Sequence, residues 1–319
     1  MRQDRNCSVN IFGHHGRVSR SDAVLRAILG AVNQTEEITS IASEIELFVQ
    51  EYGLRAVHLR GLHRETGLVV IIKVGTSARE NFWCEELHCL CQDLVPRVYA
   101  AGSSLGEIDV HWLASEAIPY GPLGNSWNGR EFELMLDAGA RFYQYAGLID
   151  DPTLDVTTRD EVSGWLEGGI RQRCPGLVDG LLSRLDDHWQ FILAKCGFET
   201  CFEDFHLCNG LMRDPPPEGE RAVLIDIHPN RRPWILDPAY LQVLNSGDRN
   251  RPGHRDLVPR MAAKRREAGL ASLEGSDLDT ATKIALGWMA ARQWQPERAD
   301  WEPHYREAYQ GFITDAGGA

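Results

Sequence analysis

A short segment, FEDFHLCNGLM at residues 202–212, brings three polar side chains close together in the sequence. Asp204, His206 and Asn209 stand directly before an apolar run. An Asp followed five positions later by an Asn is a recurrent arrangement for phosphoryl transfer. The Asp accepts the proton of an attacking hydroxyl, and the Asn oxygen binds Mg²⁺. The alternative is an Asx-rich turn that is capped by its own side chains.

Two further charged residues accompany apolar runs. Asp226 follows the triplet VLI and would supply a second metal-binding carboxylate if the runs 207–213 and 222–228 form a hairpin; the alternative is a turn Asp. Lys73 lies within the run VVIIKV and is the only Lys among the first 194 residues of a chain with 29 Arg and 4 Lys. A Lys in an apolar strand is costly to bury unless it is paired or functional. The alternative is an edge-strand Lys whose head reaches water.

The elements that must position these residues differ between the two halves of the chain. In the N-terminal part, hydrophobic periodicity predicts a helix at 20–33, a helix at 77–91 and strands at 45–51, 55–61, 67–74, 96–101 and 109–117. This pattern indicates an antiparallel sheet with one main helix packed on it. The Gly- and Pro-rich stretch 118–129 is the best boundary between two lobes.

Beyond that boundary the pattern is mostly helical. Helices are predicted at 130–148, 159–173, 176–197, 256–268, 277–293 and 301–313. We therefore expect an α+β protein with an N-terminal nucleotide-binding lobe, residues 1–117, and a larger catalytic and acceptor-binding lobe, residues 118–319.

The composition excludes several classes of partner. The formal net charge is −13, which argues against nucleic acid and anionic membranes as partners, because both require a basic face. No run approaches the roughly 20 apolar residues of a membrane span, and residues 1–15 lack the apolar core of a secretory signal. Eight cysteines in a chain of this size fit the reduced thiols of the cytoplasm, where we expect the protein to reside.

The order of these features resembles the protein-kinase-like fold of the aminoglycoside phosphotransferase family over roughly residues 45–315. Typical members carry His-Gly-Asp-Leu-His-Pro-Gly-Asn, then Ile-Asp-Trp, then Asp-Leu-Ala or Asp-Pro-Ala. The matching stretches here are FEDFHLCN at 202–209, LIDI at 224–227 and DPA at 237–239. Phe202 and Glu203 replace the family's first His and its Gly. The first of these changes affects packing rather than chemistry.

The resemblance implies a role for each matching position. It implies that Lys73 binds the ATP phosphates and is paired with Glu80, with Glu86 as the alternative partner. It also implies a phosphate-covering turn at Gly53, adenine contacts through the backbone of Ser115, Ala117 and Ile118, Asp204 as the catalytic base, Asn209 and Asp226 as Mg²⁺ ligands, and a structural Asp237.

The resemblance further implies an ATP- and Mg²⁺-dependent O-phosphotransferase; GTP is compatible, because the adenine contacts are made by the backbone. The expected acceptor is a hydroxylated small molecule, most naturally an antibiotic: an aminoglycoside, a macrolide or a nucleoside antibiotic such as capuramycin. Phosphorylation of such an antibiotic would confer resistance. The protein is expected to be a monomer or a homodimer. The alternatives are a metabolic choline, homoserine or sugar kinase and a catalytically inactive nucleotide-binding module.

Overall fold

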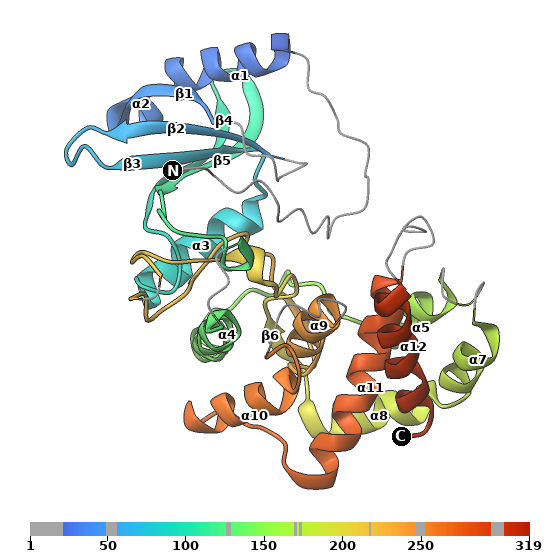
Figure 1. Ribbon diagram of the computed structural model, residues 1–319. Coiled ribbons are helices and arrows are strands. Elements are labelled where there is room, and N and C mark those ends of the chain that lie inside the picture. Colours follow the sequence, from blue (N-terminus) through green and yellow to red (C-terminus); the bar gives the residue numbers. More distant parts are fainter. Residues whose placement is uncertain are drawn as a thin grey trace. The chain divides into compact units, whose positions relative to one another are not determined.

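The computed structural model describes residues 22–48, 56–125, 129–168, 171, 174–216, 218–246, 253–294 and 303–319 (Figure 1). These residues form two compact units. The sheet unit comprises the described residues up to Tyr120 together with Val223–His228. The helical unit comprises those of 121–222 and of Pro229–Ala319.

The sheet unit is built on five antiparallel strands in the order β1-β2-β3-β5-β4. The strands are β1 (Ala42–Leu47), β2 (Val57–His63), β3 (Val69–Val74), β4 (Val98–Leu105) and β5 (Ile108–Glu116). All five predicted strands are therefore present, with ends displaced by a few residues. The end of the first predicted strand lies within residues 49–55, outside the described residues.

Alternation along β3 separates its core side chains from Lys73. Val70, Ile72 and Val74 are buried in the core cluster, which also contains residues of α1 (Asp22–Gln34) and α2 (Glu36–Ile41). Lys73 points to the opposite face, because successive strand residues alternate between faces. It pairs with His58 of β2 and Leu113 of β5, so it is not on an edge strand. Its side chain is only 16% exposed. The edge-strand interpretation of Lys73 is therefore wrong.

Helix α3 (Ala78–Leu90) follows β3 and matches the predicted helix at 77–91. It begins with a capping interaction, in which the side chain of Ser77 accepts a hydrogen bond from the Glu80 amide at 3.0 Å. Trp83 and Leu87 are fully buried. The strand β8 (Val223–Leu224) also belongs to this unit, and the Leu224 amide donates to the Leu94 carbonyl at 2.7 Å.

The helical unit contains most of the predicted helices. Its described helices are α4 (Glu131–Ala146), α5 (Arg159–Glu167), α7 (Pro175–Ser183), α8 (Leu185–Cys196), α9 (Leu236–Asn245), α10 (Leu257–Glu267), α11 (Gly275–Gln293) and α12 (Pro303–Gly317). The single helix predicted at 176–197 is wrong, because the chain breaks at Arg184 into α7 and α8. The helix predicted at 159–173 was too long, because α5 ends before Gly168.

Three elements of the helical unit have no counterpart among the predicted ones. Helix α9 contains Pro238 near its start, a position where proline is tolerated because the first amides of a helix have no intrahelical partner. Strands β6 (Glu199–Cys201) and β9 (Asn230–Arg232) form a short antiparallel pair. Strand β6 directly precedes the segment that carries Asp204, and strand β9 precedes the segment that carries Asp237. Among the described residues, no helix combines the length and apolarity needed to cross a membrane.

Candidate active site

Lys73 is the centre of an ion-pair cluster in the sheet unit. Its Nζ donates hydrogen bonds to Glu80 Oε1 and to Asp226 Oδ1, both at 2.5 Å. Burial would lower the pKa of Lys73, but the carboxylates of Asp226 and Glu80 raise it well above its usual value. Burial likewise would raise the pKa of Asp226, and Lys73 lowers it instead. Both groups are therefore charged at neutral pH.

The helix residue that meets Lys73 is Glu80. The Glu80 side chain is 4% exposed, and its second oxygen, Oε2, lies 3.8 Å from His228 Nε2. Glu86 lies six positions further along α3 and is exposed. Residues six apart point to different sides of a helix with 3.6 residues per turn, so the structure brings Glu80, and not Glu86, to Lys73.

Asp226 has an unusual backbone conformation, with a φ of 55°. The left-handed region is uncommon for residues other than Gly but is several-fold enriched in Asp and Asn. The Asp226 side chain is 44% exposed, so Oδ1 bonds to Lys73 while the carboxylate remains accessible. This geometry suits a carboxylate that shares its charge between a lysine and a second cation.

The residues predicted to contact adenine lie at the end of β5. Ser115 is paired on both sides, with Ile71 of β3 and Val98 of β4. The Ala117 amide donates to the Val69 carbonyl at 3.2 Å, and Ile118 is half-buried directly after the strand. The predicted phosphate-covering turn at Gly53 lies outside the described residues.

The loop of the helical unit that carries Asp204 holds this side chain with three partners. His206 Nε2 and Asn209 Nδ2 each lie 3.2 Å from Asp204 Oδ2, and Tyr240 Oη donates to Asp204 Oδ1 at 3.1 Å. Burial would raise the pKa of Asp204, but His206, Tyr240 and Asn209 together hold it well below the usual range. The side chain is still 41% exposed. Asp204 is therefore an oriented, ionised carboxylate that another molecule can reach.

His206 is buried against this carboxylate. Burial alone would lower the pKa of His206, but the Asp204 carboxylate raises it to about 10. The Cys208 amide lies 3.2 Å from Nδ1 and opposes protonation of that nitrogen, but the charge of the Asp204 carboxylate outweighs this neutral contact and keeps the pKa raised. In either protonation state Nε2 carries a proton that faces Asp204. His206 thus fixes one oxygen of the carboxylate.

Asp237 holds the start of the loop that carries Asp204. Its Oδ2 accepts the amide of Phe202 and the hydroxyl of Tyr143, each at 2.9 Å, and its Oδ1 accepts the amide of Glu203 at 3.3 Å. Arg232 pairs with Oδ1, and neither side chain of this ion pair is exposed. This arrangement agrees with a structural role for Asp237.

Phe202, which replaces the family's His, is fully buried. Its ring meets Phe142 edge to face at 5.4 Å between centroids, and it meets Phe205 at 6.2 Å. Its backbone amide still donates to Asp237. An apolar ring can therefore fill position 202, because the contact with Asp237 is made by the backbone amide of Phe202 and not by its side chain.

The two residues expected to bind Mg²⁺, Asn209 and Asp226, belong to different units, and each offers a side-chain oxygen. The Nδ2 group of Asn209 donates to the backbone carbonyl of Asp204 at 3.0 Å and to the Asp204 side chain, so Oδ1 is the atom that would bind a metal ion. Asp226 supplies a half-exposed carboxylate. Both groups offer hard oxygen ligands of the type that Mg²⁺ prefers, so the donor set fits this ion.

Three residues around Asp204 were missed from the sequence. Tyr240 lies on α9, Arg232 on β9 and Arg292 near the end of α11. Tyr240 and Arg232 flank the Asp-Pro-Ala motif closely, a signal that was available. Arg292 is 88 positions from Asp204 in a helix whose pattern indicates only packing, so no local signal pointed to it.

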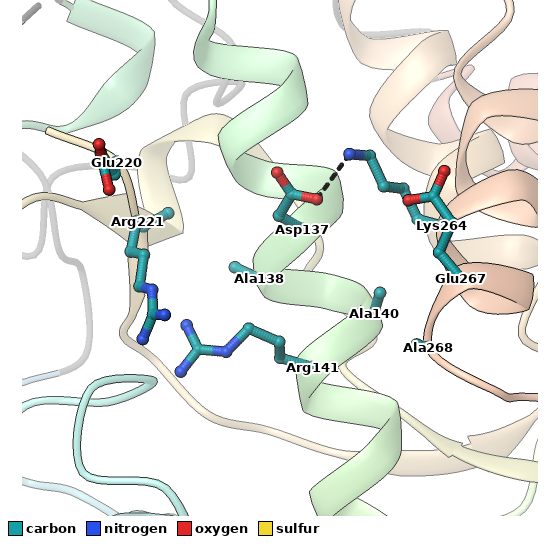
Figure 2. Close-up of a pocket in the computed structure, with 10 residues that line it drawn as sticks. Asp137, Ala138, Ala140, Arg141, Glu220, Arg221, Lys264, Glu267 and Ala268 are labelled. Atoms are coloured by element: carbon teal, nitrogen blue, oxygen red, sulfur yellow. Dashed lines mark ion pairs between the residues drawn. The ribbon is translucent and has the colours of Figure 1, made fainter.

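A pocket elsewhere in the helical unit lies beside α4 and α10 (Figure 2). Asp137 and Arg141 of α4, Lys264 of α10 and Arg221 are among its lining residues. Lys264 Nζ lies 2.8 Å from Asp137 Oδ1, the pair drawn as a dashed line. Asp204 is not among the lining residues, so this pocket is distinct from the loop that carries the proposed chemistry.

The His206–Asp204 contact predicts a pH-dependent stability. A histidine whose pKa is raised on folding stabilises the folded state. This stabilisation is fully present below the pKa of the unfolded state, about 6.5. It is lost as the pH rises through the pKa of His206 in the folded state, about 10. We expect the melting temperature of wild type to exceed that of His206→Gln most below pH 6.5, with the difference shrinking toward pH 10. Thermal melting across this range, with His111→Gln as control, measures it. A difference that stays constant with pH would contradict the proposed ion pair.

Comparison with known proteins finds similar solved structures but no similar sequence. No family model matches the chain, and no curated protein matches it in sequence. Among solved structures, it is similar to a microcompartment-associated aminopropanol kinase, with a TM-score of 0.58, 13% identity, and coverage of 91% of this chain and 95% of that one. It is also similar to choline kinase from Cryptosporidium parvum, with a TM-score of 0.56, 12% identity and the same two coverages.

An aminoglycoside phosphotransferase from Streptomyces rimosus, solved with ADP and streptomycin, has a TM-score of 0.51 at 14% identity, with coverage of 85% of this chain and 99% of that one. Identities this low establish the fold alone. The predicted fold is thereby confirmed: the chain has the protein-kinase-like fold found in aminoglycoside phosphotransferases and choline kinases.

Proposed function

We propose that the protein is an ATP- and Mg²⁺-dependent phosphotransferase that transfers the γ-phosphate to a hydroxyl group of a small molecule. The observation that carries this proposal is the bond between the strand residue Lys73 and the helix residue Glu80, on a protein-kinase-like fold. Kinases of this fold need that ion pair in place for phosphoryl transfer. The structural relatives that are small-molecule kinases support the same chemistry.

Each residue has a separate task in this proposal. Lys73 donates to the nucleotide phosphates, and Glu80 holds its ammonium group in position. Asn209 and Asp226 hold Mg²⁺, which when bound neutralises charge on the phosphates. Asp204 orients the acceptor hydroxyl and accepts its proton, a task that requires a position within about 3 Å rather than strong basicity. Its low pKa is compatible with that task, because positioning and charge neutralisation dominate phosphoryl transfer.

We propose an antibiotic as the acceptor. The likeness to a phosphotransferase solved with ADP and streptomycin supports this class, and so does the charge of −10 on residues 111–319. Next to Asp204, however, the carboxylate of Glu203 is paired with Arg292. This pairing favours a less cationic acceptor, such as a macrolide or a nucleoside antibiotic like capuramycin, over a polycationic aminoglycoside.

A metabolic kinase is the second candidate. The similarity to an aminopropanol kinase and a choline kinase, at the higher TM-scores, supports an amino alcohol acceptor as an alternative. Homoserine and sugars are further acceptors of the same kind. An inactive nucleotide-binding module is the remaining alternative, and the retained set of Lys73, Asp204, Asn209 and Asp226 argues against it.

The test is transfer of phosphate by the purified full-length protein. Mg²⁺ and ATP are combined with a panel of acceptors that includes streptomycin, a macrolide, capuramycin, choline, aminopropanol, homoserine and a sugar. Mass spectrometry then detects the added phosphate group, and an Asp204→Ala variant and a sample with EDTA serve as controls. Transfer to an antibiotic alone supports resistance, and transfer to an amino alcohol alone supports a metabolic kinase. ATP binding without transfer to any acceptor would contradict the proposal.

Lys73 provides a direct mutational test. Replacing Lys73 with Met keeps much of the apolar stem but removes the charge that faces the phosphates. We expect turnover to fall on the order of 10²–10³-fold and the KM for ATP to rise. Steady-state kinetics measure both quantities. Lys195→Met is the matched control, because Lys195 pairs with Asp277 on the exposed surface of the helical unit. Turnover of Lys73→Met within twofold of wild type would contradict the assignment.

A further inference from the structure

Glu203 has an unexpected backbone conformation next to Asp204. Its φ is 69°, in the left-handed region that a residue with a Cβ adopts at a cost in conformational energy. The similar family carries Gly at this position, which would adopt the same conformation without that cost. Strain retained beside a reactive side chain is a sign that the Glu203 side chain has a task of its own.

The Glu203 side chain reaches α11. Its Oε1 accepts a hydrogen bond from Arg292 Nη2 at 3.0 Å, and the two side chains are 31% and 25% exposed. The guanidinium carbon of Arg292 lies 5.2 Å from the ring centroid of Trp165 on α5 and 5.7 Å from that of Tyr240 on α9. Arg292 therefore connects the Asp204 loop to three helices of the same unit.

Tyr240 carries this connection to Asp204. Its hydroxyl donates to Asp204 Oδ1 at 3.1 Å. Burial and the nearby Asp204 carboxylate raise the pKa of Tyr240 well above its usual value, so the hydroxyl keeps its proton and remains a donor. The opposite oxygen, Oδ2, is held by His206 and Asn209. The carboxylate is thus oriented from two sides.

We propose that Glu203, Arg292 and Tyr240 form a brace that positions the Asp204 carboxylate for the acceptor hydroxyl. Glu203 fixes Arg292, Arg292 packs on the Tyr240 ring, and Tyr240 holds Oδ1. All three are positioning residues that act through Asp204. The brace accounts for Glu at a position where Gly would fit the backbone better. This inference rests on the proposed phosphotransferase function, in which Asp204 receives the hydroxyl proton.

The first test separates the side chain of Glu203 from its backbone. Glu203→Gly removes the backbone strain and the brace together. We expect its melting temperature to equal or exceed that of wild type, while kcat falls on the order of tenfold to a hundredfold and the KM for ATP stays unchanged. Glu44→Gly is the matched control, because Glu44 is exposed in the sheet unit and also has a positive φ, of 54°. Its kcat should equal that of wild type.

Arg292 is tested by two replacements. Arg292→Met should lower kcat as Glu203→Gly does, whereas Arg292→Lys keeps the charge beside Glu203 and should recover part of the loss. A merely structural residue would change the melting temperature and not this split between kcat and the KM for ATP. Wild-type kcat in both Glu203→Gly and Arg292→Met would overturn the proposal.

A second readout does not depend on turnover. Crystal structures of wild type, Glu203→Gly and Arg292→Met show whether the Tyr240 hydroxyl stays at Asp204 Oδ1. We expect the 3.1 Å contact in wild type and its loss in both variants, because the Tyr240 ring then lacks a fixed Arg292 guanidinium packed on it. A Tyr240–Asp204 contact that is kept in both variants would overturn the brace. If wild type phosphorylates no acceptor, the proposed function fails, and the structural comparison still decides whether the brace exists.

Discussion

Replacing Asp204 with Ala is expected to lower turnover about 10²–10⁴-fold while the KM for ATP stays close to that of wild type. The reason is that the half-exposed Asp204 carboxylate is assigned to the acceptor hydroxyl, whereas the nucleotide phosphates are assigned to Lys73 and Mg²⁺. Removing the side chain takes away the group that orients the nucleophile and accepts its proton. It leaves Lys73 bonded to Glu80 and Asp226 within the sheet unit.

Steady-state kinetics with the acceptor identified in the panel measure this effect. Asp204→Asn is the sharper variant, because the amide keeps the shape of the side chain but cannot accept the proton. Asp160→Ala is the control, since Asp160 is 91% exposed at the start of α5. Circular dichroism excludes unfolding as the cause of lost activity. Turnover of Asp204→Asn near that of wild type would show that Asp204 is not the base.

The strands and helices that could be predicted are those whose own residues carry a clear hydrophobic pattern. The apolar run at 67–74 predicted strand β3, and in the structure alternation along that strand puts Val70 and Ile72 in the core and Lys73 on the other face. The helix predicted at 77–91 is also present, and the structure shows that Ser77 caps it by accepting the Glu80 amide. These elements depend on interactions between residues close together in the sequence, so they can be predicted from the sequence alone.

The rest depends on contacts between residues far apart in the chain. Helix α9 was missed because Pro238 is usually a helix breaker, although its place in the first turn is permitted. Arg292 reaches Glu203 across 89 positions, and no spacing rule connects them. The position of Glu80 seven residues after Lys73 was a usable signal, whereas the brace around Asp204 is visible only once the helices are packed.

Replacing Asp237 is expected to cost the helical unit much of its stability. The Asp237 carboxylate is fully buried with Arg232 and also accepts the amides of Phe202 and Glu203 and the hydroxyl of Tyr143. Removing one partner of a buried ion pair leaves an uncompensated charge, which costs about 3–5 kcal/mol. We expect Asp237→Ala to lose stability of this order and Asp237→Asn to lose somewhat less, because the amide oxygen still accepts hydrogen bonds.

Chemical denaturation followed by circular dichroism measures the loss. A double variant, Arg232→Met with Asp237→Leu, separates charge from packing. If the unpaired arginine causes the loss, the double variant should be more stable than Asp237→Ala, because no buried charge remains. It should still have low turnover, since the amides of Phe202 and Glu203 lose the acceptor that holds the loop before Asp204. A double variant no more stable than Asp237→Ala would show that these backbone hydrogen bonds, and not the ion pair, account for the stabilising effect of Asp237.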